Sequence, residues 1–461
     1  MPAKYHIDTK PAPPRKRPVG KYGIVDWSED CSACRNCVKR ECVYNVYSTE
    51  DRRLREATDY VDYLYDCRSC LSCVQSCTKG LLSRRVNPAY LRLGDDFWTP
   101  DVISTTWFQA ETGKVPVSGA GYPGPFSGPG FDSMWTDMSE IVRPTRDGIH
   151  GREYISTAVD IGRKPSALSF DGAGIVTACP PILRVPLPII FDVMSWHKPP
   201  LVVERAFASA AARLGTIALF EPRHLGPQPS EHAPSVGICF HGGELGEEWL
   251  QRAPVVEFCD SGDVFDWIGR AKKINPEITG IVRLPAGSNA AVRAVRLARE
   301  GAEAIHLAAD SEGHEYGPNP RHIKDAIREV HLRLVEERLR DEVTLIASGG
   351  IALAEHVAKA IICGADLVAM DIPLMIALEC RICGKCRRGI ACPEDLGELD
   401  LDYAVQRIVN LMGAWHAQLL EVLGAMGIRE VRRLRGEVGR AMFFEDLERE
   451  TFGRMFGGQR A

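Results

Sequence analysis

The stretch "VTLIASGGIALAEHVAKAIICGADLVAMD", residues 343–371, contains two short apolar runs on either side of an amphipathic segment. The runs, "VTLIAS" at 343–348 and "DLVAMD" at 366–371, are continuous rather than alternating, which is typical of strands buried on both faces. The segment between them, 352–365, has the spacing of a helix. Two buried strands joined by a helix predict an α/β fold with a parallel sheet.

Six further apolar runs precede this stretch. They lie at 187–194, 216–220, 235–240, 255–260, 279–284 and 303–309. Helix candidates at 200–215 and 290–302 separate some of them. Eight strands alternating with crossovers predict a (β/α)8 barrel of the TIM type over residues 161–396. The second and third links are too short or too rich in proline for full helices, so we expect some distortion of the barrel.

Composition, net charge and the lengths of the apolar runs limit the classes of protein to which this chain can belong. The chain has 461 residues, 45% hydrophobic and 25% charged, as in ordinary soluble proteins with two or three domains. A net charge of −5 gives no reason to expect nucleic acid as a partner. No apolar run reaches the roughly 18 residues of a membrane span, and residues 1–20 do not resemble a secretory signal. We therefore expect a cytoplasmic protein, where sixteen cysteines favour metal or redox work over disulfides.

Twelve of the sixteen cysteines form three clusters, each of which begins C-x2-C-x2-C. This spacing lets one loop give three thiolates to an iron–sulfur cluster, with a later cysteine as the fourth ligand. Structural zinc is the alternative, although zinc ribbons use separated C-x2-C pairs. The candidate ligands are Cys31, Cys34, Cys37 and Cys42, then Cys67, Cys70, Cys73 and Cys77, and finally Cys380, Cys383, Cys386 and Cys392. The other four, Cys179, Cys239, Cys259 and Cys363, fit no such spacing and are predicted to be small buried hydrophobes.

The first two cysteine runs have the layout of a bacterial two-cluster ferredoxin, in which the fourth cysteine of each run binds the other cluster. They predict a ferredoxin-like 4Fe–4S module with a basic N-terminal arm over residues 1–112. Val43 and Thr78 stand where proline is usual after the last cysteine of each run. A connector over 113–160 begins with a stretch rich in glycine and proline, and residues 397–461 are predicted to be a helical C-terminal extension.

Glycines near the seventh and eighth predicted strands indicate a phosphate site. Barrels of this type commonly bind phosphate in these loops, where glycine lets the backbone approach an anion. The candidates are Ser348, Gly349, Gly350 and Gly364; a purely structural turn is the alternative. Together, a barrel, a phosphate loop and a cluster motif indicate flavin mononucleotide (FMN), which exchanges electrons singly with clusters and in pairs with substrates.

Residues 343–393 resemble the FMN-binding synthase domain of glutamate synthases, in which a GG motif, a helix with "VAKA", a "GAD" and a cysteine cluster ending in "CP" follow one another. Residues 275–307 look like the preceding strand–helix–strand of that family, with Arg283 where lysine is typical. "DVMSW", 192–196, lies where "SMSFG" is usual. Residues 406–436 resemble the closing segment of the short, archaeal-type members, which also carry a two-cluster ferredoxin module.

The resemblance implies an oxidoreductase that acts on the CH–NH2 group of donors and forms glutamate from 2-oxoglutarate and ammonia. It implies FMN and three clusters, the third 4Fe–4S or 3Fe–4S, with reduced ferredoxin or a partner subunit as electron source. It leaves open a separate amidotransferase subunit.

The resemblance also assigns roles to residues at the barrel mouth. Asp192, Met194 and Ser195 would lie under the flavin ring, with packing of the barrel mouth as the alternative. Arg283, the candidate catalytic residue, would place positive charge beside the flavin, with a salt bridge to a carboxylate as the alternative. His306 is predicted to be a satisfied core histidine.

One loop departs from the family pattern. The glycine-rich substrate loop of glutamate synthases is replaced by "AADSEGHEYGPNP", residues 308–320. An electron-transfer subunit of a larger redox complex, without glutamate synthase activity, is therefore the alternative function. Proline at position 2 leaves no N-terminal nucleophilic cysteine, and we expect no glutaminase domain ahead of the barrel.

Overall fold

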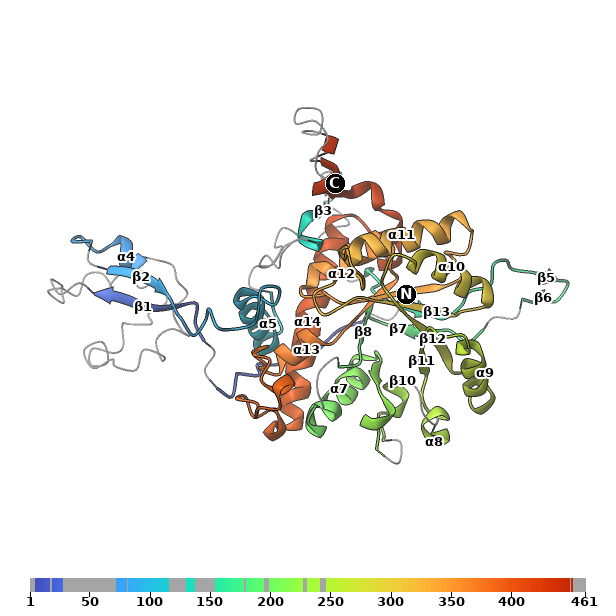
Figure 1. Ribbon diagram of the computed structural model, residues 1–461, viewed down its shortest axis with the longest axis horizontal. Helices are drawn as coiled ribbons and strands as arrows, with labels where there is room; N and C mark the ends of the chain where they lie inside the picture. Colours follow the sequence, from blue (N-terminus) through green and yellow to red (C-terminus); the bar gives the residue numbers. More distant parts are fainter. Residues whose placement is uncertain are drawn as a thin grey trace.

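Eight parallel strands close into a barrel, as predicted (Figure 1). The computed structural model describes residues 5–16, 19–27, 72–80, 82–115, 130–136, 154–177, 180–194, 199–226, 230–240, 246–447 and 449–450. The barrel strands are β8 (Ile189–Phe191), β9 (Ala218–Phe220), β10 (Val236–Phe240), β11 (Val255–Cys259), β12 (Thr279–Pro285), β13 (Ala304–Ala308), β14 (Thr344–Ser348) and β15 (Leu367–Met370). All eight predicted apolar runs are barrel strands, because helices cover the outside while side chains fill the inside.

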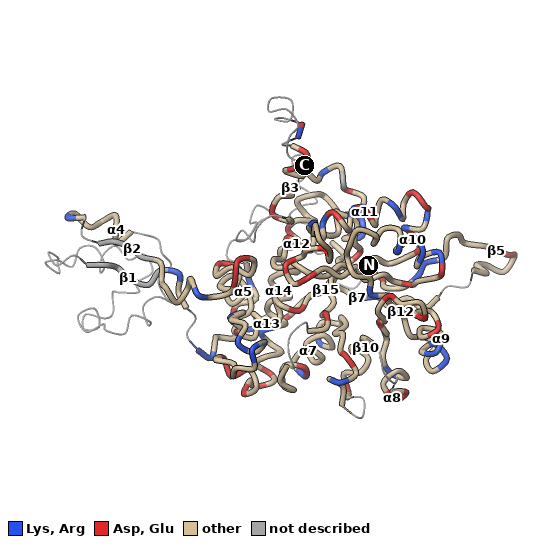
Figure 2. Tube along the Cα trace, viewed as in Figure 1, with Lys and Arg blue, Asp and Glu red and all other residues tan. Residues whose placement is uncertain are grey.

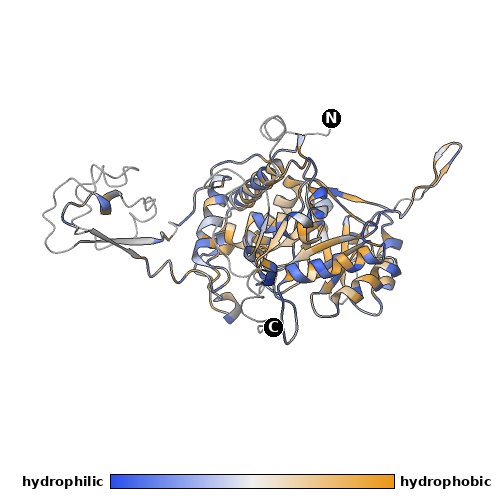
Figure 3. Cartoon of the chain, turned by 90° about the horizontal axis from the view of Figure 1, so that it is seen from above, coloured by the Kyte–Doolittle hydropathy of each residue, from blue (hydrophilic) through white to orange (hydrophobic). Residues whose placement is uncertain are grey.

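Helices surround the barrel, with hydrophobic residues gathered on their inner faces (Figure 3). They are α7 (Leu201–Leu214), α8 (Glu247–Leu250), α9 (Val264–Ile274), α10 (Ala290–Glu300), α11 (Ile323–Glu336), α12 (Ala354–Cys363), α13 (Ile372–Ala377) and α14 (Leu401–Ala425). Acidic and basic side chains are interspersed along them (Figure 2). Among the described residues of the second link there are only the 3-10 turns η3 (Pro222–His224) and η4 (Ala233–Ser235), and among those of the third only the four-residue α8, in line with the expected short links.

Helix α14 lies within the segment from residue 397 that was predicted to be a helical C-terminal extension, and it completes the ring of helices. It packs against both α7 and α12, in the place of the eighth barrel helix. The cysteine loop at 380–392 therefore lies inside the link between the eighth strand and the eighth helix. Such links emerge at the carboxyl ends of the strands, which is the face where barrel enzymes hold their active sites.

Helix α5 (Pro100–Thr112) also belongs to the barrel body, although the sequence placed it in the N-terminal module. It packs against α13 and α14, where the Asn410 amide donates to the Ala110 carbonyl at 2.9 Å. The Trp415 indole donates to the Gln109 side chain at 3.1 Å. Residues 5–16 run along α14 as well, since the Asn410 amide also donates to the Lys10 carbonyl at 2.7 Å.

Two strands of the predicted ferredoxin module are described. β1 (Tyr22–Trp27) and β2 (Leu82–Val86) form an antiparallel pair, and α4 (Ser72–Gln75) precedes β2. Of the eight cysteines in this module, only Cys73 and Cys77 lie within the described residues. The other six, Cys31, Cys34, Cys37, Cys42, Cys67 and Cys70, lie outside them, as do residues 116–129 of the connector. The module itself therefore stays a prediction.

Smaller pairs of strands lie around the barrel. β4 (Val159–Ile161) pairs with β7 (Leu183–Val185), and β3 (Met134–Thr136) pairs with β16 (Ala441–Phe443). The hairpin of β5 (Phe170–Asp171) and β6 (Gly174–Ile175) projects away from the body (Figures 1 and 3). Short 3-10 turns are η1 (Phe131–Ser133), η5 (Cys386–Arg388), η6 (Leu396–Glu398), η7 (Val431–Gly436) and η8 (Val438–Arg440). Within the described ranges, no helix has the length and apolar character needed to cross a bilayer.

Candidate functional site

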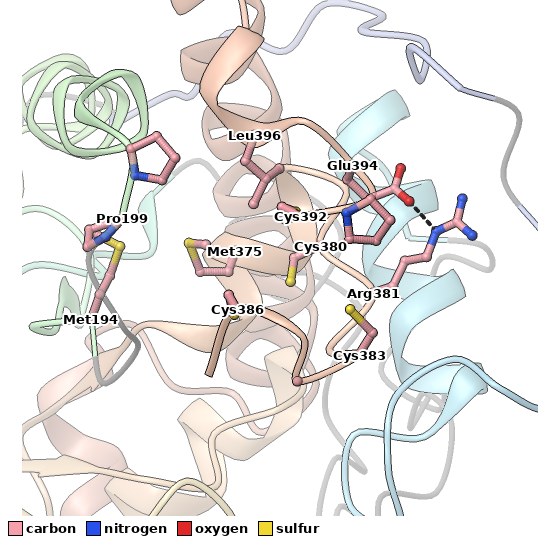
Figure 4. A pocket seen from close by; sticks show the side chains of 13 residues that line it. Met194, Pro199, Met375, Cys380, Arg381, Cys383, Cys386, Cys392, Glu394 and Leu396 are labelled. Carbon is pink, nitrogen blue, oxygen red and sulfur yellow. Dashed lines mark ion pairs between the residues drawn. The ribbon is translucent and has the colours of Figure 1, made fainter. Parts of the chain in front are cut away.

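The four cysteines of the third cluster motif line a single cavity of about 160 Å³ (Figure 4). The rest of its wall comes from the end of β8, the start of α7 and α13. The lining residues are Met194, Pro199, Pro200, Met375, Cys380, Arg381, Cys383, Gly384, Cys386, Cys392, Pro393, Glu394 and Leu396. Four sulfur ligands in a mostly apolar cavity fit an iron–sulfur cluster, because thiolates are the ligands that hold such clusters.

The backbone of the cysteine loop adopts unusual angles that turn it around this cavity. Glu379, Ile382 and Asp395 all have positive φ, at 72°, 53° and 47°. Such conformations in residues other than glycine are uncommon and cluster at functional sites. Burial raises the pKa of the Cys380 thiol to about 12. A bound metal ion would deprotonate it, since coordination stabilises the thiolate form.

Two segments next to the predicted ferredoxin module hold the cysteine loop. The Arg15 backbone N–H and its Nε donate to the two carboxylate oxygens of Glu379, at 2.7 and 2.9 Å. Lys16 Nζ donates to the Pro393 carbonyl at 2.7 Å. On the other side of the module, the Gly94 N–H donates to the Arg381 carbonyl at 3.0 Å. The chain therefore enters and leaves the module region beside this loop.

The wall of the cysteine cavity connects to the barrel mouth through the end of β8. Met194 lines the cavity, and Asp192 lies two residues earlier, at the carboxyl end of the strand. The Asp192 carboxylate accepts hydrogen bonds from both terminal nitrogens of Arg283, at 2.7 and 3.0 Å. Arg283 Nη1 also donates to the Glu257 carboxylate at 2.9 Å. The salt bridge that the sequence left as the alternative for Arg283 is therefore present.

His306 lies fully buried beside this ion pair. Its Nδ1 is 2.6 Å from Glu257 Oε2, and its Nε2 is 2.8 Å from Ser348 Oγ. It is thus the satisfied core histidine that the sequence predicted. Cys239, on β10, donates its thiol to Glu257 Oε1 at 3.2 Å. We call Asp192, Glu257, Arg283, His306 and Ser348 the buried polar cluster.

Mutual attraction keeps the buried polar cluster ionised. Burial acts to raise the pKa of Glu257, but His306 and Arg283 outweigh it and hold that pKa well below its usual range. The pKa of Asp192 is lowered in the same way, against burial, by Arg283 and His306. Burial acts to lower the pKa of Arg283, but the two carboxylates raise it above its ordinary value. At neutral pH two carboxylates and one guanidinium therefore share this interior.

Sequence reasoning missed Glu257, although a signal was present. It is the one charged residue in the first five positions of the apolar run "VVEFCD", and its side chain is completely buried. An acidic residue in a strand buried on both faces needs a charged or hydrogen-bonding partner. Arg283 and His306, on the next two strands, are those partners.

Gly349 and Gly350 form a tight turn at the end of β14, next to Ser348. Both have positive φ, at 99° and 66°. A Cβ on Gly349 would lie 2.4 Å from the Asp310 carbonyl oxygen, and one on Gly350 would lie 2.6 Å from Gly313 Cα. Glycine is therefore required here by the close approach of the 308–320 loop, whatever else the turn binds.

The structure does not bring Gly364 together with this turn. It ends helix α12 and precedes β15, so it lies at the amino end of the barrel strands, whereas Gly349 and Gly350 lie at the carboxyl end. Arg340 Nη2 donates to the Gly364 carbonyl at 2.6 Å, and a Cβ on Gly364 would lie 2.4 Å from the His331 side chain. Ser195, also predicted to contact the flavin, lies outside the described residues.

The 308–320 loop lies against the barrel mouth. The Tyr316 N–H donates to the Ala286 carbonyl at 2.7 Å, and its hydroxyl donates to the Ala309 carbonyl at 3.2 Å. The indole of Trp98, just before α5, donates to the Ser311 carbonyl at 3.2 Å. The loop is therefore tied both to the residue that follows β12 and to the segment just before α5.

Comparison with known proteins identifies similar chains. Residues 243–429 match a family model described as the conserved region in glutamate synthase. An archaeal glutamate synthase [NADPH] from Methanocaldococcus jannaschii is 28% identical over 95% of this chain and 98% of its own. An archaeal-type glutamate synthase [NADPH] from Dehalococcoides mccartyi is 26% identical over 90% of this chain and 93% of its own. These matches confirm the resemblance seen in the sequence motifs.

A solved structure is also similar in part. The recombinant flavin-binding domain of baker's yeast flavocytochrome b2 is 11% identical, with a TM-score of 0.45, over 81% of this chain and 88% of that one.

Proposed function

We propose that this chain, a relative of the archaeal-type glutamate synthases, is an FMN- and iron–sulfur-dependent oxidoreductase acting on the CH–NH2 group of donors. In the direction of synthesis it would form glutamate from 2-oxoglutarate and ammonia, with electrons from reduced ferredoxin or a partner subunit. The ammonia would be taken up directly or supplied by a separate amidotransferase subunit.

The observation that carries the proposal is the cavity shared by four cysteines and Met194. Its cysteines lie in the link after the eighth strand, and Met194 follows the first strand of the barrel. A cluster held there would adjoin the carboxyl end of the barrel, where a flavin would bind. Cofactors set this close can exchange electrons without movement of the chain.

The turn at Gly349 and Gly350 supports the phosphate end of an FMN site. Helix α12 begins just after the turn, and its N-cap residue, Leu353, has no side chain that could cap the helix. The first N–H groups of such a helix favour an anion. When bound, FMN would accept electrons singly and give them to a substrate in pairs. Asp192, Met194 and Arg283 would lie below its ring and fix its orientation.

The N-terminal module would be the entry point for electrons. Arg15 and Lys16 before it, and Gly94 after it, all bond to the cysteine loop. This anchoring would hold two further 4Fe–4S clusters, on the eight N-terminal cysteines, within reach of the third cluster. Electrons would then pass from the module to the Cys380–Cys392 cluster and on to the flavin.

The test is anaerobic purification followed by cofactor analysis and assay. We expect FMN, and close to twelve iron and twelve sulfide per chain, as three cubes require. With chemically reduced ferredoxin, 2-oxoglutarate and ammonia, glutamate should accumulate. Stoichiometric zinc with little sulfide, or a protein without flavin, would overturn the proposal.

One observation favours a second function, that of an electron-transfer subunit without glutamate synthase activity. The 308–320 loop lacks the glycine-rich sequence of the family and packs directly on Gly350, where a Cβ would also lie 2.8 Å from the Glu312 carbonyl oxygen. In this alternative, the purified protein contains FMN and iron but forms no glutamate, while still passing electrons from ferredoxin to an artificial acceptor.

A further inference from the structure

The buried polar cluster contains a histidine, His306, whose Nε2 faces a hydroxyl that can either donate or accept a hydrogen bond. We infer that His306 binds one proton from water when electrons reach the flavin, and so balances the charge that arrives above it. This inference rests on the proposed flavin, and it assigns His306 a positioning role rather than a catalytic one.

The hydrogen bonds of His306 fix where the proton would enter. The carboxylate of Glu257 can only accept, so the nitrogen 2.6 Å from it, Nδ1, carries a hydrogen and donates. In the neutral ring Nε2 then has a free lone pair, which accepts from the Ser348 hydroxyl at 2.8 Å. The uncommitted position of the ring therefore faces Ser348, next to the Gly349–Gly350 turn.

Ser348 suits both charge states of the ring. Its hydroxyl can donate to neutral Nε2, or rotate and accept from a protonated Nε2 at the same distance. Protonation would therefore leave no unsatisfied group around the buried ring, and would strengthen the existing bond to Glu257.

The charge balance gives a reason for the proton. With neutral His306, Asp192 and Glu257 against Arg283 leave one net negative charge in a buried site. Negative charge placed on a flavin above would add repulsion where the effective dielectric constant is low. A protonated His306 brings the net charge of the cluster to zero and relieves that repulsion.

The groups that face His306 come from four strands. Glu257 on β11 and Ser348 on β14 bond to the ring, Arg283 Nη1 on β12 is 3.5 Å from Nδ1, and Asp192 Oδ2 after β8 is 3.9 Å from Nε2. The pKa values of Asp192 and Glu257 are held low and that of Arg283 is held high, so these three groups keep their charges near neutral pH.

For each pair of electrons supplied by reduced ferredoxin, one proton from water forms an N–H bond at Nε2, and no bond to carbon forms or breaks. Added negative charge raises the affinity of His306 for this proton. The extra uptake is therefore confined to the pH range in which the ring is neutral before reduction and protonated after it.

The experiment measures the flavin midpoint potential of the holoprotein against pH by spectroelectrochemistry. In that pH range the unmodified protein should show a slope steeper by about 30 mV per pH unit, which corresponds to one proton per two electrons. His306→Gln keeps a donor for Glu257 and an acceptor for Ser348 but cannot take a proton, so the steeper range should vanish. His331→Gln, a buried histidine at the other end of the barrel, should retain it.

Identical profiles for the unmodified protein and His306→Gln would overturn the inference. If His306→Gln fails to fold, the ¹⁵N chemical shift of His306 Nε2, measured in histidine-labelled protein before and after reduction, decides the question instead. An unchanged shift at every pH would overturn the inference as well. A failure of the proposed function is seen separately, because protein without flavin absorbance would reveal it before any titration.

Discussion

The two ends of the barrel each contain a buried arginine bound to an aspartate, but the two arginines use their remaining donors differently. At the carboxyl end, Arg283 bonds to the side chains of Asp192 and Glu257. At the amino end, Arg340 bonds to Asp366 at 2.9 Å and also to the backbone carbonyls of residues 343 and 364, at 2.9 and 2.6 Å.

The difference separates a network that holds the backbone from one built between side chains. The carbonyls bound by Arg340 belong to the ends of secondary-structure elements, and Asp366 also accepts the Leu345 N–H at 2.8 Å and Arg435 Nη1 at 2.7 Å. Arg340 Nε also donates to His331 Nδ1 at 3.1 Å. Much of that network therefore holds backbone groups. Within the described residues, the cluster around Arg283 instead joins side chains from several strands below the mouth.

The largest effect is expected from removing a ligand at the carboxyl end. Cys386→Ser should lose the third cluster, and with it about a third of the iron, because a hydroxyl is a poor ligand for such clusters. The barrel should stay folded, since Cys386 lies in a link after the eighth strand and is only partly buried. Iron and sulfide analysis with circular dichroism checks this; unchanged iron content would show that the cysteines hold no cluster.

A matched pair of glycine substitutions sharpens the contrast between the ends. Gly350→Asp places a negative side chain at the proposed phosphate site, so flavin affinity should fall tenfold or more, about 1.4 kcal/mol at least. Gly364→Ala, at the amino end, should destabilise the fold by clashing with His331 but should retain flavin. Flavin absorbance after gel filtration measures both.

A control separates the phosphate from the loop. Gly350 also touches Gly313, so Gly350→Asp must displace the 308–320 loop. Gly313→Ala disturbs the same contact without adding a charge, and it should keep its flavin. Equal flavin loss in Gly313→Ala and Gly350→Asp would indicate that the loop, and not a phosphate, requires the glycine.

The arginine networks should differ in what their loss changes. Arg340→Ala leaves Asp366 buried with fewer partners and should cost about 3–5 kcal/mol of unfolding free energy. It should leave the flavin potential unchanged, because the amino end lies away from the mouth. Urea denaturation and redox titration of one preparation test both; a shifted potential would contradict the separation of the two ends.

The smallest effect concerns pH. Burial, together with Arg340 and Arg435, lowers the pKa of His331 to about 4. An unfolded histidine titrates near about 6.5, so the unfolded chain binds more protons and stability falls as the pH drops from there towards 4. His331→Gln should make this loss shallower by about 1–2 kcal/mol, after allowance for solvent screening. Identical pH profiles of urea midpoints would show that the ring is not held neutral.

The sequence predicted the barrel well, because its strands are continuous apolar runs and their burial leaves little choice of structure. The spacing of the third cysteine motif predicted that its four cysteines share one site, and they line one cavity, while the cluster itself stays a prediction. The position of helix α14 in the ring of helices was not predicted, because it depends on packing against α7 and α12, far away in the sequence. Local pattern cannot distinguish the last helix of a barrel from an extension.

The polar residues were harder to predict. Asp192 and Arg283 lie at the mouth of the barrel, but from the sequence alone a flavin contact and a salt bridge both remained open for Arg283. Gly364 was grouped with Gly349 and Gly350 on sequence proximity, although a helix carries the chain to the other end of the barrel between them. Glu257 was overlooked because its strand was read only for apolar residues.

The central claim is that electrons pass from the Cys380–Cys392 cluster to a flavin at the carboxyl end of the barrel. Anaerobic stopped-flow mixing with reduced ferredoxin tests it most directly, with flavin absorbance as the signal. We predict that the flavin of the unmodified protein is bleached rapidly, whereas Cys386→Ser retains bound flavin that is bleached at least tenfold more slowly, a barrier higher by about 1.4 kcal/mol. Equal bleaching rates in the two proteins would contradict the account.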